Sequence, residues 1–157
     1  MARTRGDGRE VEAEAPPLSL TFLLLGAGRE AQRRVDEALE PIGLTVRHVG
    51  ALGHLSRQPD LSYSDLARRA GVTVQSMHAT VRQLEERGTV RRAHEGQGRR
   101  AGLEVTPRGR RLLAQAMEAF ARLDEELFAD VPADRRAELT SVLVRLVLPD
   151  VAAEGPP

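Results

Sequence analysis

Two short helical patterns and a hairpin pattern follow one another within residues 61–109 of this chain. Ser62 and Asp65 have the spacing of a capping box at a helix start, and Gly71 is of the type that ends helices in the left-handed conformation. Thr73 can cap a second helix, which a further glycine ends. Two helices joined by a tight turn containing glycine have the spacing of a helix-turn-helix unit.

The apolar pattern changes from helical to alternating after this unit. Val90 leads one strand, Leu103 and Val105 lie on the other, and the loop between them contains the sequence EGQG. The dipeptide Thr106-Pro107 then restarts a helix, with threonine as its cap and proline as its first residue. A hairpin directly after a helix-turn-helix is a wing, so the sequence predicts a winged helix-turn-helix domain at 44–111.

Long helical patterns with apolar stripes flank this domain. A first helix is expected at roughly 18–40, and two more at about 107–130 and 132–148. A chain of this size would struggle to cover all these stripes, and burial of apolar area favours a partner. We therefore expect an N-terminal dimerisation helix at 17–43 and C-terminal dimerisation helices at 112–148.

The predicted fold class is mainly α with a small β-hairpin. A further apolar helix is expected at about 45–56, within the winged domain. The polar, aperiodic segments 1–16 and 149–157 are expected to be disordered tails. The apolar stretch 18–28 is too short to span a bilayer, so no membrane contact is expected. Cysteine is absent, which excludes disulfides and thiolate metal sites and fits a cytoplasmic protein.

Positive charge gathers in the middle of a chain whose net charge is zero. All 23 basic residues are arginine, and they balance 23 acidic residues. Residues 47–111 hold 13 arginines against 6 acidic residues, whereas 1–46 and 112–157 have net charges of −2 and −5. A basic middle between acidic ends is typical of a nucleic-acid-binding protein. A GC-rich genome is the alternative explanation for the arginines.

The second helix of the helix-turn-helix has an apolar side and an outward side. Met77, Val81 and Leu84 recur at helical spacing and are expected to face the domain. A helix that enters the major groove by its N-terminal part reads base edges with its outward side chains. Here Gln75 suits adenine, and Arg82 suits guanine or a phosphate. The outward residues are Val74, Gln75, Ser76, His78, Ala79 and Arg82.

Two arginine pairs, Arg91-Arg92 and Arg99-Arg100, lie on either side of the hairpin loop. The negative potential of the minor groove attracts arginine, so the tip of the hairpin is expected to reach the flanking minor groove or the DNA backbone. Three glycines in and beside the loop let the chain turn sharply and lie close to DNA. The alternative is a solvated hairpin whose arginines serve solubility.

The order of these elements resembles the MarR family of bacterial transcription regulators over about residues 18–148. The resemblance rests on LTVRHVGALGHL, on LSYSDLARRAGVTVQSMHATVRQLEERGTVRR, and on RRAGLEVTPRGRRLL with its threonine-x-x-glycine motif after the wing. The family implies a winged-helix homodimer with interleaved terminal helices and a pseudo-palindromic operator on double-stranded DNA. It implies a transcription regulator, expected to be a repressor, which a small aromatic or phenolic ligand releases.

The resemblance also implies roles for single residues. Ser76–Ala79 would read bases, Arg82 and Ser62 would contact the DNA backbone, and Arg99 or Arg100 would enter the minor groove. The family usually has an aspartate shortly before the wing arginine to orient it. Here that position is a glycine, so the choice between the two arginines stays open. The residues expected to contact DNA are Ser62, Thr73, Val74, Gln75, Ser76, His78, Ala79, Arg82, Arg99 and Arg100.

The aromatic acids that family members bind lie between the dimer helices and the winged domain. By resemblance, Arg47, His48 and the first helix are expected to line such a site. His48 and His54 point to different sides of one helix, and the histidines do not cluster, so neither a metal nor another cofactor is expected. No catalytic constellation and no phosphate-binding glycine loop occurs in the sequence, so an enzyme is not expected.

Two other functions are consistent with the same elements. The first is a winged-helix module for protein–protein interaction that does not bind DNA, against which the outward arginines argue. The second is a small-molecule hydrolase or metal-dependent enzyme, which metal analysis of the purified protein would test.

Overall fold

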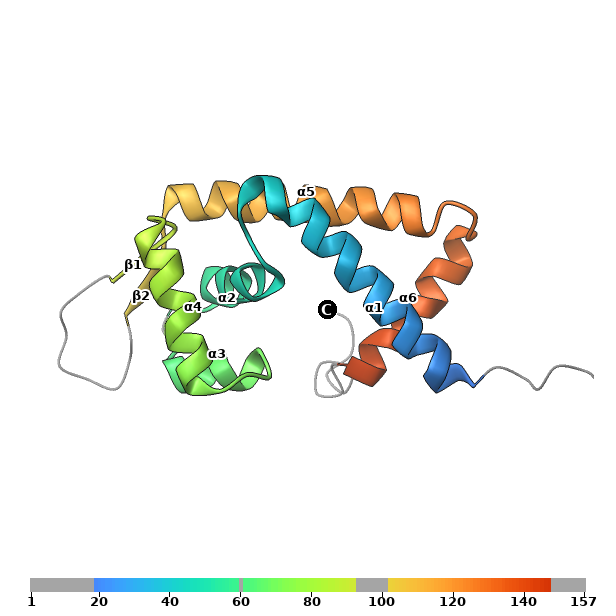
Figure 1. Cartoon of the computed structure of the whole chain (residues 1–157), viewed down its shortest axis with the longest axis horizontal. Helices are drawn as coiled ribbons and strands as arrows, with labels where there is room; N and C mark the ends of the chain where they lie inside the picture. The colour runs from blue at the N-terminus through green and yellow to red at the C-terminus, as the bar shows by residue number, and fades with distance from the viewer. Residues whose placement is uncertain (1–18, 60, 93–101, 148–157) are drawn as a thin grey trace, which may run out of the picture. The chain divides into compact units, whose positions relative to one another are not determined.

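The computed structural model describes residues 19–59, 61–92 and 102–147. Helices account for most of them, and one pair of strands forms a hairpin (Figure 1). The elements in chain order are α1 (Leu20–Leu39), η1 (Glu40–Ile42), α2 (Val46–Arg57), α3 (Tyr63–Arg69), α4 (Val74–Glu86), β1 (Val90–Arg92), β2 (Leu103–Val105), α5 (Pro107–Leu127) and α6 (Ala133–Val147). The predicted fold class, mainly α with a small β-hairpin, is confirmed. The tails predicted at 1–16 and 149–157 lie outside the described residues.

The chain divides into two compact units, residues 1–32 and 33–157. The described part of the first unit consists mainly of the beginning of α1. Its apolar side chains are exposed, and Leu20 and Phe22 expose 83% and 69% of their surface. Within the described residues, no helix is long and apolar enough to cross a membrane. The predicted boundaries of the dimerisation helices and the winged domain stay predictions.

Hydroxyl caps and left-handed glycines mark the ends of α3 and α4. Ser62 accepts a hydrogen bond from the Asp65 backbone N–H at 3.1 Å, and the Asp65 carboxylate accepts one from the Ser62 backbone N–H. Thr73 caps α4 through its own hydroxyl oxygen. Gly71 and Gly88 follow the two helices with φ of +63° and +65°, a conformation that costs glycine little. The predicted caps at Ser62 and Thr73, and the predicted helix ends at Gly71 and Gly88, are therefore confirmed.

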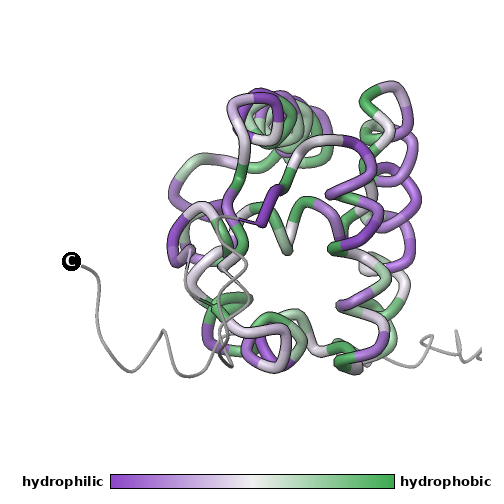
Figure 2. Tube along the Cα trace, turned by 90° about the vertical axis from the view of Figure 1, so that its left-hand side faces the viewer, coloured by the Kyte–Doolittle hydropathy of each residue, from purple (hydrophilic) through white to green (hydrophobic). Residues whose placement is uncertain are grey.

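The hydrophobic core of the second unit gathers around α2, which contacts α4, α5 and β2. Leu52 and Leu55 of α2 belong to one buried cluster with Met77, Val81 and Leu84 of α4. Burial of each such side chain stabilises the fold by about 1.5–3 kcal/mol. Along the helices, hydrophobic and hydrophilic stretches alternate, as they do in helices with one buried side (Figure 2). The predicted inward side of α4 is confirmed.

Strands β1 and β2 pair antiparallel, with Val90 opposite Val105 and Arg91 opposite Glu104. Val90, Val105 and Leu103 are buried, whereas the two arginines of β1 are exposed. The hairpin is therefore attached to the core by Val90 of β1 and by Leu103 and Val105 of β2, while the rest of β1 is exposed.

The start of α5 is locked against the segment that follows α4. Thr106 caps α5, and its hydroxyl donates to the Gly88 carbonyl oxygen at 2.7 Å. The Thr106 backbone N–H also donates to the Thr89 carbonyl oxygen at 3.0 Å. A Cβ atom on Gly109 would lie only 2.1 Å from that same Thr89 oxygen. The threonine-x-x-glycine motif thus holds α5 against the base of the hairpin.

Candidate nucleic-acid interface

The outward side of α4 carries most of the residues predicted to contact DNA. Four of them are exposed: Val74, Gln75, His78 and Arg82. Two are half-buried: Ser76 and Ala79. The core-facing row of the same helix lies on the other side, so the core holds α4 in place while these side chains remain accessible. The predicted orientation is confirmed, and contact with DNA stays a prediction.

The hydroxyl groups of Ser62 and Thr73 are engaged in helix capping. Ser62 Oγ donates to Asp65 Oδ2 at 2.6 Å, and Thr73 Oγ1 donates to Ser76 Oγ at 2.9 Å. The Ser76 hydroxyl thereby acts as an acceptor in this bond, and its own proton remains available to a further acceptor. The Ser62 hydrogen bond is the main cause that lowers the pKa of Asp65, and the ion pair with Arg68 at 2.6 Å adds to it.

An aromatic pair joins the two helices of the helix-turn-helix. The Tyr63 ring, at the first position of α3, stacks on the His78 imidazole of α4 with centroids 3.8 Å apart and planes 18° apart. No pattern in the sequence indicates this contact, since Tyr63 and His78 are 15 positions apart and meet only through the packing of α3 against α4. In the sequence, Tyr63 stands out only because it is the single tyrosine of the chain.

The same tyrosine contacts the base of the hairpin. Arg92 of β1 donates through Nη2 to the Tyr63 hydroxyl at 3.4 Å and through Nε to Glu85 Oε1 at 3.0 Å. Burial is the main cause that raises the pKa of Tyr63, and the neighbouring Arg92 opposes it. Glu85 of α4 is half-buried. Like Tyr63, it belongs to the candidate interface although nothing in the sequence marks it.

The arginine pair on β1 is compensated within the fold. Arg91 pairs with Glu104, directly across the hairpin, at 2.8 Å, and Arg92 pairs with Glu85. Exposed ion pairs contribute at most about 1 kcal/mol each to stability, but they fix where the guanidinium groups point. Arg91 and Arg92 are therefore structural members of the hairpin base. The other pair, Arg99 and Arg100, lies outside the described residues.

His48 has a structural role at the start of α2. Its Nδ1 accepts a hydrogen bond from the Thr45 backbone N–H at 3.2 Å, and its Nε2 lies 2.9 Å from Gln83 Oε1 of α4. Because Nδ1 is an acceptor, the proton of the neutral ring sits on Nε2 and is donated to Gln83. Burial is the main cause that lowers the pKa of His48, and the Arg87 charge acts in the same direction. Its predicted neighbour in a ligand site, Arg47, is exposed.

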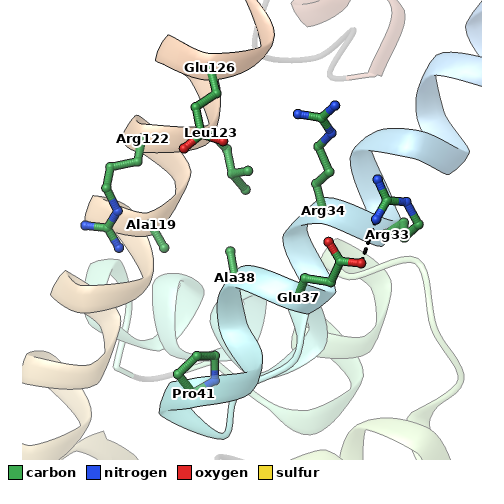
Figure 3. A pocket seen from close by; sticks show the side chains of 9 residues that line it. All are labelled: Arg33, Arg34, Glu37, Ala38, Pro41, Ala119, Arg122, Leu123 and Glu126. Atoms are coloured by element: carbon green, nitrogen blue, oxygen red, sulfur yellow. Dashed lines mark hydrogen bonds and ion pairs between the residues drawn. The ribbon is translucent and has the colours of Figure 1, made fainter.

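A pocket of about 480 Å³ lies between the end of α1 and the middle of α5 (Figure 3). Its charged lining includes Arg34 and Arg122, together with an ion pair between Arg33 and Glu37 at 2.6 Å. The complete lining is Arg33, Arg34, Glu37, Ala38, Pro41, Ala119, Arg122, Leu123 and Glu126. Guanidinium groups beside the apolar Leu123 suit a small molecule that has both a carboxylate and a ring.

Among residues 19–59, 61–92 and 102–147, no group of three or more histidine, aspartate or glutamate side chains could hold a metal ion. The structure describes three histidines, His48, His54 and His78, and they do not form a cluster. His48 belongs to a helix cap, and His78 stacks on Tyr63.

Comparison with known proteins finds a matching family model, similar sequences and similar solved structures. A sequence model of the MarR family matches residues 42–101. The HTH-type transcriptional repressor Rv2887 of Mycobacterium tuberculosis is 36% identical over 128 residues, which cover 81% of this chain and 92% of the relative.

Two crystal structures of Rv2887 superpose on this chain. In its complex with DNA, Rv2887 gives a TM-score of 0.71 at 32% identity, over 83% of this chain and 99% of that one. In its complex with salicylic acid, it gives a TM-score of 0.67 at 34% identity, over 83% and 98%. The family model, the 36% identity to the Rv2887 repressor and the shared fold agree, and the chain belongs to the MarR family.

Proposed function

We propose that this protein is a transcriptional repressor that binds a double-stranded operator as a homodimer in the cytoplasm. The observation that carries the proposal is that α4 has Met77, Val81 and Leu84 in the core and a row of accessible side chains on its opposite side. The Rv2887 repressor, which has been crystallised with DNA, supports the assignment by its similarity. We assign no catalytic activity to the chain.

Base choice is proposed to come from Gln75, Ser76 and His78, with Val74 and Ala79 providing apolar contacts to thymine methyl groups. Arg82, one turn further along α4, is proposed to bind a phosphate. Ser62 and Thr73 act through the backbone N–H groups that begin their helices, because their hydroxyls are engaged in capping. Arg99 or Arg100 is proposed to enter the minor groove.

The homodimer is proposed from the apolar surface that the terminal helices leave uncovered. No residue of α6 is buried, and its Val142 and Leu146 are exposed. Met117 of α5 is exposed as well. A twofold axis would bring two copies of α4 to one face, about one turn of DNA apart, and would account for a pseudo-palindromic operator.

An aromatic carboxylate is proposed as the effector that releases the operator. Rv2887 has been crystallised with salicylic acid, and two of the exposed arginines of this chain are proposed as partners for such a carboxylate. One is Arg47, beside His48 at the start of α2. The other is Arg122, in the pocket between α1 and α5. Binding of salicylate to the Arg47→Ala and Arg122→Ala variants, measured by calorimetry, assigns the site to the variant that loses affinity.

The test of DNA binding uses the full chain and pools of genomic duplexes. Selection by gel shift, followed by sequencing, is expected to enrich a two-half-site sequence. Arg82→Ala should then weaken binding to every duplex and lower the salt slope by about one, since one phosphate contact is lost. Arg145→Ala removes an exposed arginine of α6 and is the matched control, with affinity unchanged. Absence of any enriched duplex at low salt would overturn the proposal in favour of a protein-interaction module.

A further inference from the structure

We infer that Tyr63 is a specificity-determining residue, which positions the His78 imidazole for base reading by stacking on it. The inference rests on the proposed DNA-binding function. It concerns a residue of α3, outside the row of α4 side chains that face outward. The juxtaposition that carries it is one aromatic ring between the recognition helix and the base of the hairpin.

The stack fixes a ring that the helix alone would leave mobile. His78 is exposed, and within the described residues no hydrogen bond to its ring nitrogens is found. An exposed imidazole on a helix can rotate about two side-chain bonds. The Tyr63 ring, 3.8 Å away and tilted by only 18°, covers one face of the imidazole, while the His78 residue as a whole remains exposed. A ring presented edge-on is suited to hydrogen bonds with base edges.

Tyr63 is itself held from three directions, so it can act as a rigid support. The capping box formed by Ser62 and Asp65 fixes the backbone where Tyr63 begins α3. Arg92 donates to the Tyr63 hydroxyl and is anchored by Glu85. The Tyr63 ring is half-buried and packs against the core cluster. Side chains locked by such supporting contacts lose little freedom when a partner binds.

This arrangement assigns different roles to the two parts of the Tyr63 side chain. The ring supports His78, and the hydroxyl accepts a hydrogen bond from Arg92 of the hairpin. Tyr63→Phe keeps the ring and is the matched control, because it removes only the long hydrogen bond to Arg92. Tyr63→Leu keeps apolar bulk at the edge of the core but removes the stack.

A first experiment measures the stack without DNA. In nuclear magnetic resonance spectra of the full chain, the carbon-bound ring protons of His78 should be shifted upfield by the Tyr63 ring. The Phe variant should keep this shift and the Leu variant should lose it. Equal His78 resonances in the Leu variant and the parent protein would overturn the inference, whatever the protein binds.

A second experiment measures base preference with operators selected by the parent protein. Tyr63→Leu should reduce the preference for the selected duplex over single-base variants by about two- to tenfold, the range expected for loss of one aromatic pair. Its affinity for random duplexes should not change. In a His78→Ala background, the Leu change should have no further effect on base preference, and Tyr63→Phe should behave like the parent protein.

The outcomes separate the inference from the function on which it rests. If the parent protein selects no duplex, the proposed function fails, while the resonance test still decides whether the stack exists. If the parent protein selects a duplex and the Leu variant reads it with the same preference, the function stands and the role of Tyr63 is overturned. An equal loss in the presence and absence of His78 would likewise reduce Tyr63 to a general structural residue.

Discussion

At the scale of single residues, His48 shows how a helix cap can depend on protonation. Its Nδ1 accepts the Thr45 N–H and its Nε2 donates to Gln83, so both bonds require the neutral ring. A second proton would place two N–H groups face to face at Thr45. The lowered pKa of His48 agrees with this geometry, since the fold favours the neutral form.

A pH-dependent contribution of His48 to stability follows from this preference. Because the folded pKa lies below the ordinary value of 6.5, the unfolded chain binds more protons in the window between the two. The contribution is therefore complete above about pH 6.5 and is lost as the pH falls through the folded pKa. Urea unfolding of the parent protein between pH 7.5 and 5 should show this decline.

His48→Gln is the matched variant for that measurement. Glutamine at this helix position can accept the Thr45 N–H without titrating, so the cap persists while the pH dependence weakens. Loss of the Gln83 hydrogen bond should cost about 1 kcal/mol at pH 7.5. His54, whose pKa is also lowered, mainly by burial, titrates in both proteins and cancels in the comparison. Identical pH profiles for the two proteins would contradict the assigned role.

Residue-scale features were predictable from the sequence wherever they are local. The caps at Ser62, Thr73 and Thr106 depend on side chains three positions from the groups they bind, so spacing is sufficient to find them. The contacts of His48 with Gln83 and of Tyr63 with His78 join residues on different helices. Their existence depends on how helices cross, which single-chain periodicity does not contain.

At the scale of elements, the winged domain follows from its sequence because each element has an unambiguous pattern. The apolar row on α4 is buried, and so are Leu103 and Val105, the alternating apolar residues of β2. The charge pattern was less informative, since it does not distinguish Arg91, paired across the hairpin with Glu104, from an arginine free to reach DNA. Which arginine pairs with Glu104 depends on the register of the two strands, and the sequence of the hairpin loop does not determine that register.

The junction between β2 and α5 gives a prediction at this scale. Gly109→Ala should destabilise the fold by about 3 kcal/mol or more, since the added Cβ meets a backbone oxygen at 2.1 Å and the Val105 side chain at 2.8 Å. Either α5 or the base of the hairpin has to move. Thermal unfolding followed by circular dichroism measures the effect.

Gly50→Ala is the matched control for this prediction. Gly50 lies inside α2, and a Cβ added there meets no atom within 4 Å. Alanine should therefore raise stability by about 0.5–1 kcal/mol through its better helix propensity. Similar melting temperatures for Gly109→Ala and the parent protein would show that the close approach is not rigid.

At the scale of the whole molecule, the proposed dimer gives the terminal helices two roles, in the stability of the fold and in DNA binding. A helix such as α6, with no buried residue and an apolar side, has little reason to remain folded alone in water. In the second unit, α6 adds Leu139, Val142 and Leu146 to an exposed apolar surface. A second copy of the chain would bury that surface and at the same time pair two copies of α4 for a two-half-site operator.

Val142→Glu is the change that separates these two effects of pairing. A carboxylate on the apolar side of α6 should oppose burial against a partner and shift the protein toward monomer at micromolar concentration. Ser141→Glu introduces the same charge on the adjacent, polar side of the helix and should leave the dimer intact.

Light scattering coupled to size-exclusion chromatography measures the mass of each variant, and gel shifts measure binding to the selected operator. The Val142 variant should bind the two-half-site operator more weakly by at least tenfold yet keep its affinity for one half-site, because the loss of avidity leaves each winged domain folded. A parent protein that runs as a monomer, or a Val142 variant that remains dimeric, would mean that the apolar side of α6 faces something other than a second copy.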